Sequence, residues 1–276
     1  MKTIPFTKMV AAGNDFLVLD NDVETDCNLS LHLAIRMCAR HTGIGADGLL
    51  ILEPSKKTDY KMRIINADGS EAEMCGNGAR CLAAYIVHRY NESKKIFGLE
   101  TMAGVIEATA NGECARVRLS DPKDYRADVS FKVNGRLLHA STIDTGVPHA
   151  VIFVDSLSQI AVETIGRTIR FHDFFKPRGT NVDFVEQLNR NLVELRTYER
   201  GVEAETLGCG TGAVAAGLIG FCKANPHVQN QKSAAMKVKT KSGEVLDVTF
   251  DIHEGILSNV WLKGSARFVA QGEYYV

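Results

Sequence analysis

The sequence predicts an α/β (α+β) protein of two pseudo-symmetric domains, each with an antiparallel strand layer wrapped around a central helix. Three observations predict this class. A Cys-Gly-x-Gly-Ala turn followed by an apolar, Ala-rich run occurs twice, at Cys75 and at Cys209. The order of strands and helices around the two turns is the same, as expected for a duplicated architecture. The strands come in hairpin runs with only two helices per half, which favours antiparallel pairing over parallel βαβ units.

Composition restricts the class of protein and of partner. The chain has 276 residues, of which 45% are hydrophobic and 24% charged, so it is long enough for two modest domains with buried cores. The formal net charge is −1 and there is no long run of one sign, which disfavours nucleic acid and anionic membranes as partners. No apolar run approaches membrane-spanning length, and the first residues lack a signal or transit pattern. We therefore expect a cytoplasmic protein.

The cysteine content predicts reduced thiols. The seven cysteines form no CxxC pair and their number is odd, so the sequence indicates neither a zinc site nor a disulfide framework. We expect no metal. Two of the cysteines stand at predicted helix starts, and we interpret the other five as structural: Cys27, Cys38, Cys81, Cys114 and Cys222.

In the first half, apolar runs alternate with turns rich in Gly, Asn and Asp. Asn28 or Ser30 is suited to cap a helix over residues 31–40. The Asn111-Gly112 pair predicts a hairpin. The predicted elements are strands at 2–10, 16–20, 49–53 and 61–66, a helix at about 76–91, and strands at 99–102, 106–110 and 115–120.

After Asp121-Pro122 the same order begins again. The predicted elements are strands at 138–144 and 150–154, a helix at 158–169, strands at 180–186 and 192–199, a helix at about 210–223, and strands at 235–240, 245–251 and 257–262. We predict a first domain from residues 1–120 with 266–276, because the last strand returns to it, and a second domain from 121–265. The active site is expected in the cleft between them.

The two cysteine turns predict a site for a carboxylate flanked by two thiols. The first N–H groups of a helix have no partner within the helix, and the helix dipole adds partial positive charge there. We expect the N–H groups of Gly76, Asn77, Gly210 and Thr211 to hold the carboxylate of a small molecule. The same environment is expected to lower the pKa of a thiol.

This arrangement predicts inversion at the carbon next to the carboxylate. A thiolate on one face removes the α-proton, and a thiol on the other face returns a proton, so no cofactor is needed. Fixed donors at the carboxylate stabilise the developing charge by about 3–4 kcal/mol each. The two cysteines must carry opposite protonation states and titrate as a coupled pair. A single cysteine is more often a small buried apolar residue, but the duplication favours catalysis.

Motifs spread from residue 13 to residue 212 resemble those of the diaminopimelate epimerase family. They occur in the family's order and at close to its spacing. The segments are Gly13-Asn14-Asp15-Phe16, Asn66-Ala67-Asp68-Gly69-Ser70-Glu71, Cys75-Gly76-Asn77-Gly78-Ala79-Arg80, Pro148-His149, Asn181-Val182, Glu199-Arg200-Gly201, Glu205-Thr206 and Cys209-Gly210-Thr211-Gly212.

The resemblance implies two β-barrel-like domains, each around a central helix, and a homodimer. It implies that the protein interconverts LL- and meso-diaminopimelate, in lysine and peptidoglycan precursor synthesis, without pyridoxal phosphate or metal. Cys75 and Cys209 match the two acid/base residues. The family's substrate-binding positions are matched by Asn14, Asn66, Asn181 and Arg200, and the positions that tune the thiols or hold the α-ammonium by His149 and Glu199. Without the resemblance, the asparagines would indicate only turns, Arg200 a surface charge and His149 a loop histidine.

Two positions depart from the family pattern, which often has Asn at Val147 and Gln at Gly48, so we do not transfer those substrate contacts. The chain from Arg200 to Cys209 is also one residue longer than the commonest form.

Three alternative functions stay open. A proline or hydroxyproline racemase, a broad amino acid racemase or a methylaconitate-type isomerase would use the same two thiols or similar groups. A thiol redox sensor would use them as a switchable pair. An amino acid binding protein of this fold would not need two thiols at helix starts.

Overall fold

The structure is a computed structural model that describes residues 2–20, 31–92 and 95–276. The chain divides into two compact units, one of Met1–Val117 with Lys263–Val276 and one of Arg118–Leu262. The predictions for Cys27 and for a helix cap at Asn28 or Ser30 lie outside the described residues.

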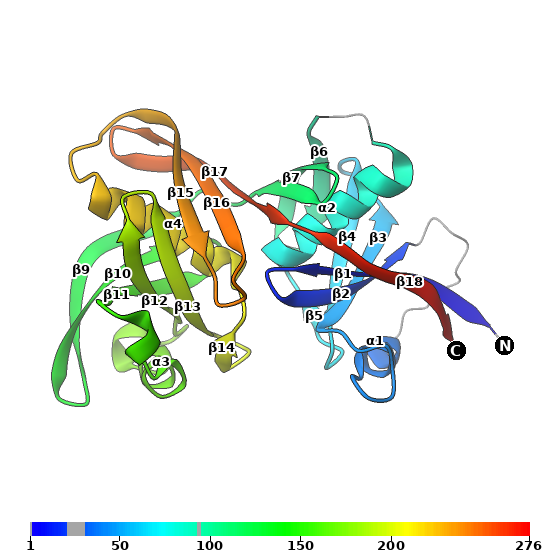
Figure 1. Cartoon of the computed structure of the whole chain (residues 1–276), viewed down its shortest axis with the longest axis horizontal. Coiled ribbons are helices and arrows are strands. Elements are labelled where there is room, and N and C mark those ends of the chain that lie inside the picture. Colours follow the sequence, from blue (N-terminus) through cyan, green and yellow to red (C-terminus); the bar gives the residue numbers. More distant parts are fainter. Residues whose placement is uncertain (1, 21–30, 93–94) are drawn as a thin grey trace. The chain divides into compact units, whose positions relative to one another are not determined.

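The first unit combines two helices with strands from both ends of the chain (Figure 1). Its elements are β1 (Thr3–Ala11), β2 (Asn14–Asp20), α1 (Leu31–Cys38), β3 (Gly48–Pro54), β4 (Tyr60–Asn66), β5 (Glu71–Ala72), α2 (Gly76–Tyr90), β6 (Phe97–Thr101), β7 (Gly104–Asn111), β8 (Cys114–Arg118) and β18 (Arg267–Tyr275).

The second unit repeats this order. Its elements are β9 (Lys123–Val133), β10 (Arg136–Asp144), β11 (Pro148–Phe153), the 3₁₀ turn η1 (Leu157–Gln159), α3 (Val162–Arg170), the 3₁₀ turn η2 (Asp173–Phe175), β12 (Asn181–Asn189), β13 (Leu192–Glu199), β14 (Ala204–Thr206), α4 (Gly210–Ala224), β15 (Gln231–Lys239), β16 (Val245–His253) and β17 (Ile256–Ser265).

Strand pairing confirms the internal repeat. In the first unit β2 pairs with β3, β3 with β4, β4 with β6 and β6 with β7. In the second unit β11 pairs with β12, β12 with β13, β13 with β15 and β15 with β16. The elements β2, α1, β3, β4, α2 and β6 therefore correspond to β11, α3, β12, β13, α4 and β15.

The expectation of wholly antiparallel layers is wrong at two pairs in each unit. The pairs β2–β3, β4–β6, β11–β12 and β13–β15 are parallel, and they are bridged by α1, α2, α3 and α4, respectively. A parallel pair needs a long crossover, and a helix supplies it. The layers are therefore mixed, with antiparallel hairpins between the crossovers.

The terminal strands complete the two layers in a corresponding way. In the first unit β18 runs antiparallel to β1, from Thr3 opposite Tyr275 to Val10 opposite Arg267, and Figure 1 shows the red strand beside the blue one. In the second unit β9 runs antiparallel to β10. Strand β9 therefore takes in its unit the position that β18 takes in the first.

The two cysteine helices are the buried centres of their units. Every residue from Gly76 to Ile86 of α2 is buried, as are Gly210 and the run from Gly212 to Phe221 of α4. A helix that is apolar on all sides is stable only when it is surrounded by protein. Small residues permit the close approach of the strands, since a Cβ at Gly217 would lie 3.0 Å from the Val248 side chain.

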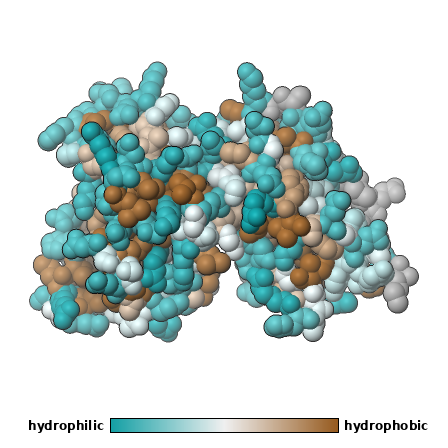
Figure 2. Space-filling view, viewed as in Figure 1, coloured by the Kyte–Doolittle hydropathy of each residue, from teal (hydrophilic) through white to brown (hydrophobic). Residues whose placement is uncertain are grey.

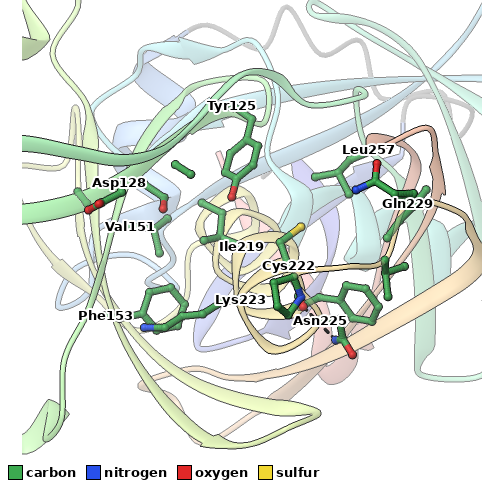
Figure 3. A pocket seen from close by; sticks show the side chains of 18 of the residues that line it. Tyr125, Asp128, Val151, Phe153, Ile219, Cys222, Lys223, Asn225, Gln229 and Leu257 are labelled. Atoms are coloured by element: carbon green, nitrogen blue, oxygen red, sulfur yellow. Dashed lines mark hydrogen bonds between the residues drawn. The ribbon is translucent and has the colours of Figure 1, made fainter.

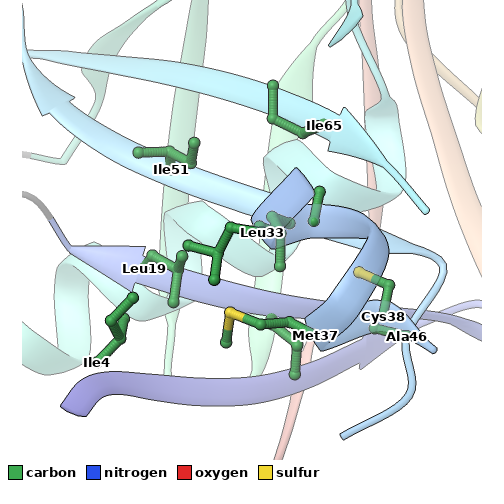
Figure 4. Close-up of a cluster of buried hydrophobic side chains, with 11 residues drawn as sticks. Ile4, Leu19, Leu33, Met37, Cys38, Ala46, Ile51 and Ile65 are labelled. Carbon is green, nitrogen blue, oxygen red and sulfur yellow. The ribbon is translucent and has the colours of Figure 1, made fainter. Parts of the chain in front are cut away.

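The outer helices cover the other face of the strands. In the first unit Figure 4 shows Leu33 and Met37 of α1 packed among Leu19, Ile51 and Ile65 of the strands. In the second unit Val162 and Ile169 of α3 belong to an equivalent cluster with Val182 and Phe184. Each layer is therefore covered on one face by its cysteine helix and on the other by its amphipathic outer helix.

Three strands were missing from the sequence prediction, namely β5, β9 and β14. Strands β5 and β14 have only two and three residues, too few for a periodic signal. Strand β9 exposes most of its residues, but apolar and polar side chains alternate along it from Tyr125 to Val133, so it could have been recognised. The predicted helix at 158–169 begins later, at Val162, after η1. The other predicted strands and helices in the described residues are confirmed.

The surfaces of the units are predominantly polar. Figure 2 shows that exposed apolar side chains gather in separate patches between polar ones. Within the described residues, no helix is long and apolar enough to cross a membrane.

Candidate active site

Both predicted catalytic cysteines are the N-cap residues of the central helices. Cys75 caps α2 with φ −144° and ψ 119°, and Cys209 caps α4 with φ −99° and ψ 117°. Each Sγ accepts a hydrogen bond from the backbone N–H three residues on, at 3.4 Å from the nitrogens of Gly78 and Gly212. A cysteine sulfur thus takes the place of the usual Ser, Thr, Asp or Asn side chain. The glycine-rich turn and the extended cap residue determine where each sulfur lies.

The surroundings of Cys75 include an amide held by a charged cluster. The Cys75 thiol donates to Asn14 Oδ1 at 3.8 Å, and Asn14 Nδ2 donates to Asp47 Oδ2 at 2.6 Å. Asp47 also accepts from Arg40 at 2.6 Å, and Arg40 pairs with Asp15 at 2.8 Å. Because Asp47 accepts from the nitrogen of Asn14, the oxygen of that amide must face the sulfur.

The surroundings of Cys209 are a buried polar network. Cys209 Sγ lies 3.4 Å from Thr211 Oγ1, and Thr211 Oγ1 lies 3.0 Å from His149 Nε2. His149 Nδ1 lies 2.6 Å from Asp183 Oδ2, and Asp183 Oδ1 accepts from Thr197 Oγ1 at 2.7 Å. The side chains of His149 and Asp183 are completely buried.

The pKa of Cys209 differs from the expectation for a helix N-terminus. Burial raises the pKa of this thiol well above its usual value, and the nearby carboxylates of Glu199 and Asp183 raise it further. Hydrogen bonds from Thr211 and Gly212 act in the opposite direction but do not prevail. The prediction of a lowered pKa is therefore wrong for Cys209 in this state, because loss of solvent outweighs the helix-end donors. The thiol is protonated at neutral pH.

Glu199 ends β13 beside this network. Burial raises the pKa of its carboxyl above the usual value, while Thr206, His149 and Cys209 partly offset that effect. Two titratable groups with displaced pKa values therefore lie together at the start of α4. Such clusters are more frequent at functional sites than elsewhere.

Asn181 connects the start of β11 with the end of β13. Its Nδ2 lies 3.3 Å from Pro148 O and 3.4 Å from His149 Nε2, and its Oδ1 accepts from the backbone N–H of Arg200 at 2.7 Å. The Arg200 guanidinium donates to Arg178 O at 3.2 Å. The amide of Asn181 thus holds in place the histidine and the arginine that the sequence placed in the site.

The first-turn residues that the sequence assigned to a carboxylate are arranged alike in the two units. Gly76, Asn77 and Gly210 are buried and Thr211 is half-buried. Asn77 Oδ1 accepts from Arg80 Nη2 at 2.8 Å within α2.

Asn66 lies at the end of β4, exposed, where its Nδ2 donates to Ser70 Oγ at 2.9 Å. Strand pairing sets it opposite Gly48. A Cβ at Gly48 would lie 2.7 Å from the backbone oxygen of Ile65, so a side chain there requires the strands to move apart.

Within each unit the structure brings most of the predicted residues together. Cys75, Gly76, Asn77 and Asn14 form one group in the first unit. Cys209, Gly210 and Thr211 form the other in the second unit, with the residues that the network of contacts joins to them, namely His149, Glu199, Asn181 and Arg200.

Sequence reasoning missed three polar residues in these groups: Asp47, Asp183 and Thr197. A signal was present for two of them. In a strand alternate residues share a face, so Asp183 points to the same side as Asn181, and Thr197 to the same side as Glu199. Polar residues at alternate positions of otherwise apolar strands indicate a polar patch under the helix start.

A cavity lies away from both groups of predicted residues. It has a volume of about 560 Å³ and belongs to the second unit, with Tyr125, Phe153, Cys222 and Lys223 among its lining residues (Figure 3). Cys222 and Lys223 stand in the last turn of α4, at the opposite end from Cys209. None of the predicted site residues lines it. No group of three or more His, Cys, Asp or Glu side chains in the described ranges could hold a metal ion.

A family model and close relatives match nearly the whole chain. The model of the family described as diaminopimelate epimerase matches residues 6–122 and 141–269. A diaminopimelate epimerase of Aquifex aeolicus is 40% identical over 278 residues, covering 97% of this chain and 96% of the relative. A diaminopimelate epimerase of Chlorobaculum tepidum is 40% identical over 267 residues, covering 96% and 98%.

Solved structures share the fold at low identity. A Bacillus anthracis phenazine biosynthesis protein of the PhzF family has a TM-score of 0.73 and 18% identity, covering all of both chains. A hydroxyproline epimerase from Agrobacterium vitis has a TM-score of 0.69 and 13% identity, covering 98% of this chain and 92% of that one. These likenesses confirm the predicted fold class of two strand layers around central helices.

Proposed function

The chain belongs to the diaminopimelate epimerase family, and we propose that it interconverts LL- and meso-diaminopimelate by two-thiol chemistry without a bound cofactor. The observation that carries the proposal is the pair of cysteine N-caps, one on the buried central helix of each unit. The names of relatives that match nearly end to end support the substrate. This reaction serves the synthesis of lysine and of peptidoglycan precursors.

In the proposed reaction the enzyme takes one proton from the substrate and gives one proton back. The thiolate of one cysteine takes the α-proton, and the electron pair of the broken C–H bond moves toward the adjacent carboxylate. The thiol of the other cysteine then gives its proton to the opposite face of the same carbon. Configuration inverts, and the two sulfurs exchange protonation states, so Cys75 and Cys209 act as a coupled pair.

The backbone of the two helix starts supplies the stabilisation of charge. In the proposed complex the N–H groups of Gly76, Asn77, Gly210 and Thr211 donate to the carboxylate on which negative charge develops. Fixed donors of this kind contribute about 3 kcal/mol each to lowering the barrier. The helix dipoles act in the same direction.

The raised pKa of Cys209 supports a defined protonation state of this thiol at the start of the reaction. Because burial and the two carboxylates raise its pKa, Cys209 begins as the thiol that donates a proton. Glu199 and His149, which lie beside Cys209, then adjust its proton affinity or hold the α-ammonium group.

The distal amino acid group of diaminopimelate requires polar contacts of its own. We assign its carboxylate to the planar guanidinium of Arg200, which binds carboxylates with two parallel hydrogen bonds. We assign its ammonium group to the amide oxygens of Asn14, Asn66 and Asn181.

We also propose that the active enzyme is a cytoplasmic homodimer, which light scattering would detect as twice the chain mass of 30.2 kDa.

The test follows α-hydrogen exchange and product formation by NMR, with reduced protein and LL-diaminopimelate in D₂O. Cys75→Ser and Cys209→Ser are compared with Cys114→Ser, a control at an exposed cysteine outside the proposed site. We expect wild type and Cys114→Ser to exchange the proton and form the meso isomer, and each of the other two variants to lose at least about 100-fold in kcat.

Absence of exchange in reduced wild-type protein would overturn the substrate assignment. Proline, hydroxyproline and glutamate are run as parallel substrates, and turnover of one of these instead would identify a racemase of another specificity. Retention of full activity in either Cys75→Ser or Cys209→Ser would contradict the two-thiol mechanism.

A further inference from the structure

The two cysteine helices begin over different side chains although their backbones correspond. A Cβ built at Gly78 would meet Leu50 and Phe16, whereas one built at Gly212 would meet Asp183 and Thr197. Strand register gives the same correspondence. Phe16 opposite Gly48 corresponds to His149 opposite Asn181, and Leu50 opposite Ile64 corresponds to Asp183 opposite Thr197. The apolar trio Phe16, Leu50 and Ile64 is thus replaced by the polar trio His149, Asp183 and Thr197.

Burial of three polar side chains costs free energy unless they are hydrogen-bonded. Asp183 and His149 are completely buried and Thr197 is 3% exposed, yet at the same places in the first unit apolar residues fill the space. An ionised carboxylate in the interior must be fully hydrogen-bonded to persist. Asp183 meets this demand with one partner for each oxygen, Thr197 at 2.7 Å and His149 at 2.6 Å.

The contacts of Asp183 determine how His149 presents its other nitrogen. A carboxylate only accepts hydrogen bonds, so Nδ1 of His149 carries a proton and Nε2 of the neutral ring is left as an acceptor. Nε2 faces Thr211 Oγ1 at 3.0 Å, and Thr211 Oγ1 lies 3.4 Å from Cys209 Sγ. Thr211 Oγ1 therefore lies within hydrogen-bond distance of both sites and bridges the Cys209 thiol to the imidazole, while the thiol also contacts the Glu199 carboxylate.

We propose that Asp183 is a positioning residue of the epimerase, which holds His149 so that the imidazole takes up and returns the Cys209 proton through Thr211. The proposal rests on the proposed function for the role of Cys209. In the step, the S–H bond of Cys209 breaks and its proton binds Thr211 Oγ1, while the hydroxyl proton of Thr211 binds His149 Nε2. The products are a thiolate and an imidazolium, whose positive charge Asp183 balances.

This path changes the protonation state of Cys209 between the two directions of the reaction. A two-thiol epimerase needs Cys209 as a thiol in one direction and as a thiolate in the other. The titratable groups that face Cys209 are Glu199 on β13, Asp183 on β12 and His149 on β11. The two carboxylates oppose formation of the thiolate, and an imidazolium on His149 would compensate the negative charge of the thiolate.

Two effects of Asp183 on the thiol have opposite signs, which makes the proposal testable. If Asp183 acted only as a nearby negative charge, its neutralisation would make the Cys209 thiolate form at lower pH. If it acts by supporting the imidazolium, its neutralisation removes the acceptor for the thiol proton, and the thiolate forms at higher pH.

The experiment measures the pH dependence of Cys209 alkylation by iodoacetamide, read by mass spectrometry of the Cys209 peptide in a Cys75→Ser background. This measurement needs no substrate, so it remains informative if diaminopimelate is not turned over. Asp183→Asn is compared with Asp20→Asn, a buried aspartate bound by Tyr85 and Tyr90 in the first unit. We expect Asp183→Asn to raise the alkylation midpoint by about one pH unit and Asp20→Asn to leave it unchanged.

Steady-state kinetics with both cysteines present gives the second readout. We expect Asp183→Asn to lower kcat by about 100-fold, with KM within about threefold, because the buried carboxylate does not touch the substrate. Thr211→Val keeps the backbone N–H but interrupts the path, so it should raise the midpoint similarly. The double variant should lose no more kcat than the larger single loss.

A lowered or unchanged midpoint in Asp183→Asn would overturn the proposal. If Asp183→Asn does not fold, as judged by circular dichroism, Thr211→Val alone tests the proposal. Thr211 is only half-buried, so we expect this variant to fold. An unchanged midpoint and kcat in Thr211→Val would equally overturn it.

Discussion

At the residue scale, the same backbone role is combined with different side-chain surroundings. Cys75 and Cys209 both cap buried helices and both accept a hydrogen bond at 3.4 Å. The side chains beneath them differ, with Leu50 under one turn and Asp183 under the other. Two thiols with the same backbone role therefore lie in different surroundings, and those of Cys209 raise its pKa.

Charged pairs near the second cysteine also make stability depend on pH. Burial alone would raise the pKa of Glu205, but hydrogen bonds from Arg196 and Lys241 prevail and hold this pKa below its usual value. Glu205 binds Arg196 through two bonds of 2.6 and 2.8 Å, which fastens β14 to β13 just before Cys209. A carboxyl whose folded pKa is lowered stabilises the protein above the unfolded pKa, and this contribution is lost as pH falls through the folded pKa.

We therefore expect Glu205→Gln to lower the free energy of unfolding by about 2 kcal/mol at pH 7. The difference from wild type should shrink as pH falls below the usual Glu value of 4.5, where the wild-type carboxyl also becomes neutral. Urea unfolding at several pH values measures this. The exposed Glu273→Gln serves as a control, and a difference that does not change with pH would contradict the prediction.

At the element scale, each cysteine helix begins with a glycine that permits close contact with the strands. A Cβ at Gly212 would lie 2.7 Å from Asp183 Oδ1 and 3.1 Å from Thr197 Oγ1. A Cβ at Gly78 would lie 2.9 Å from Leu50 Cδ2, the end of a flexible side chain. The first neighbours are fixed by hydrogen bonds and cannot move without breaking them, while Leu50 can change rotamer.

We expect Gly212→Ala to cost about 3 kcal/mol in unfolding free energy and Gly78→Ala about 1 kcal/mol. The two variants are matched, because each adds one methyl group at the same position of corresponding helices. Urea unfolding followed by circular dichroism compares them. An equal or larger loss in Gly78→Ala would show that the hydrogen-bonded network yields as easily as an apolar side chain.

At the scale of the whole molecule, the first unit depends on both ends of the chain. Strand β18 contributes a long antiparallel ladder to β1, and β1 otherwise pairs with β2. Without β18, the N–H and C=O groups along one edge of β1 would lose their partners. The second unit, Arg118–Leu262, lies within one continuous segment and does not include β18.

Deletion of residues 267–276 should therefore destabilise the first unit selectively. We expect hydrogen exchange measured by mass spectrometry to show lost protection in β1 and β2 and retained protection in α4 and β12. Deletion of Val276 alone, which removes a single bond to Lys2 O, is the control. Equal loss of protection in both units would contradict this assignment of β18.

The fold was largely predictable because its signals are local and duplicated. The two Cys-Gly-x-Gly-Ala turns identified the central helices, and apolar periodicity identified most strands. Strand β9 was missed although apolar and polar residues alternate along it from Tyr125 to Val133. The parallel pairs were not predicted, since strand direction depends on how the intervening helix returns the chain and not on side-chain pattern.

The sequence by itself determined the family, the duplicated halves and the positions of Cys75 and Cys209, because motifs and helix starts are written in consecutive residues. Only the tertiary structure decided the environment of each thiol. His149, Asp183 and Thr197 come from three different strands, and strand register sets them under Gly212 and Cys209. Proton affinity depends on burial and on neighbours across strands, so the raised pKa of Cys209 could not be read from its place at a helix start.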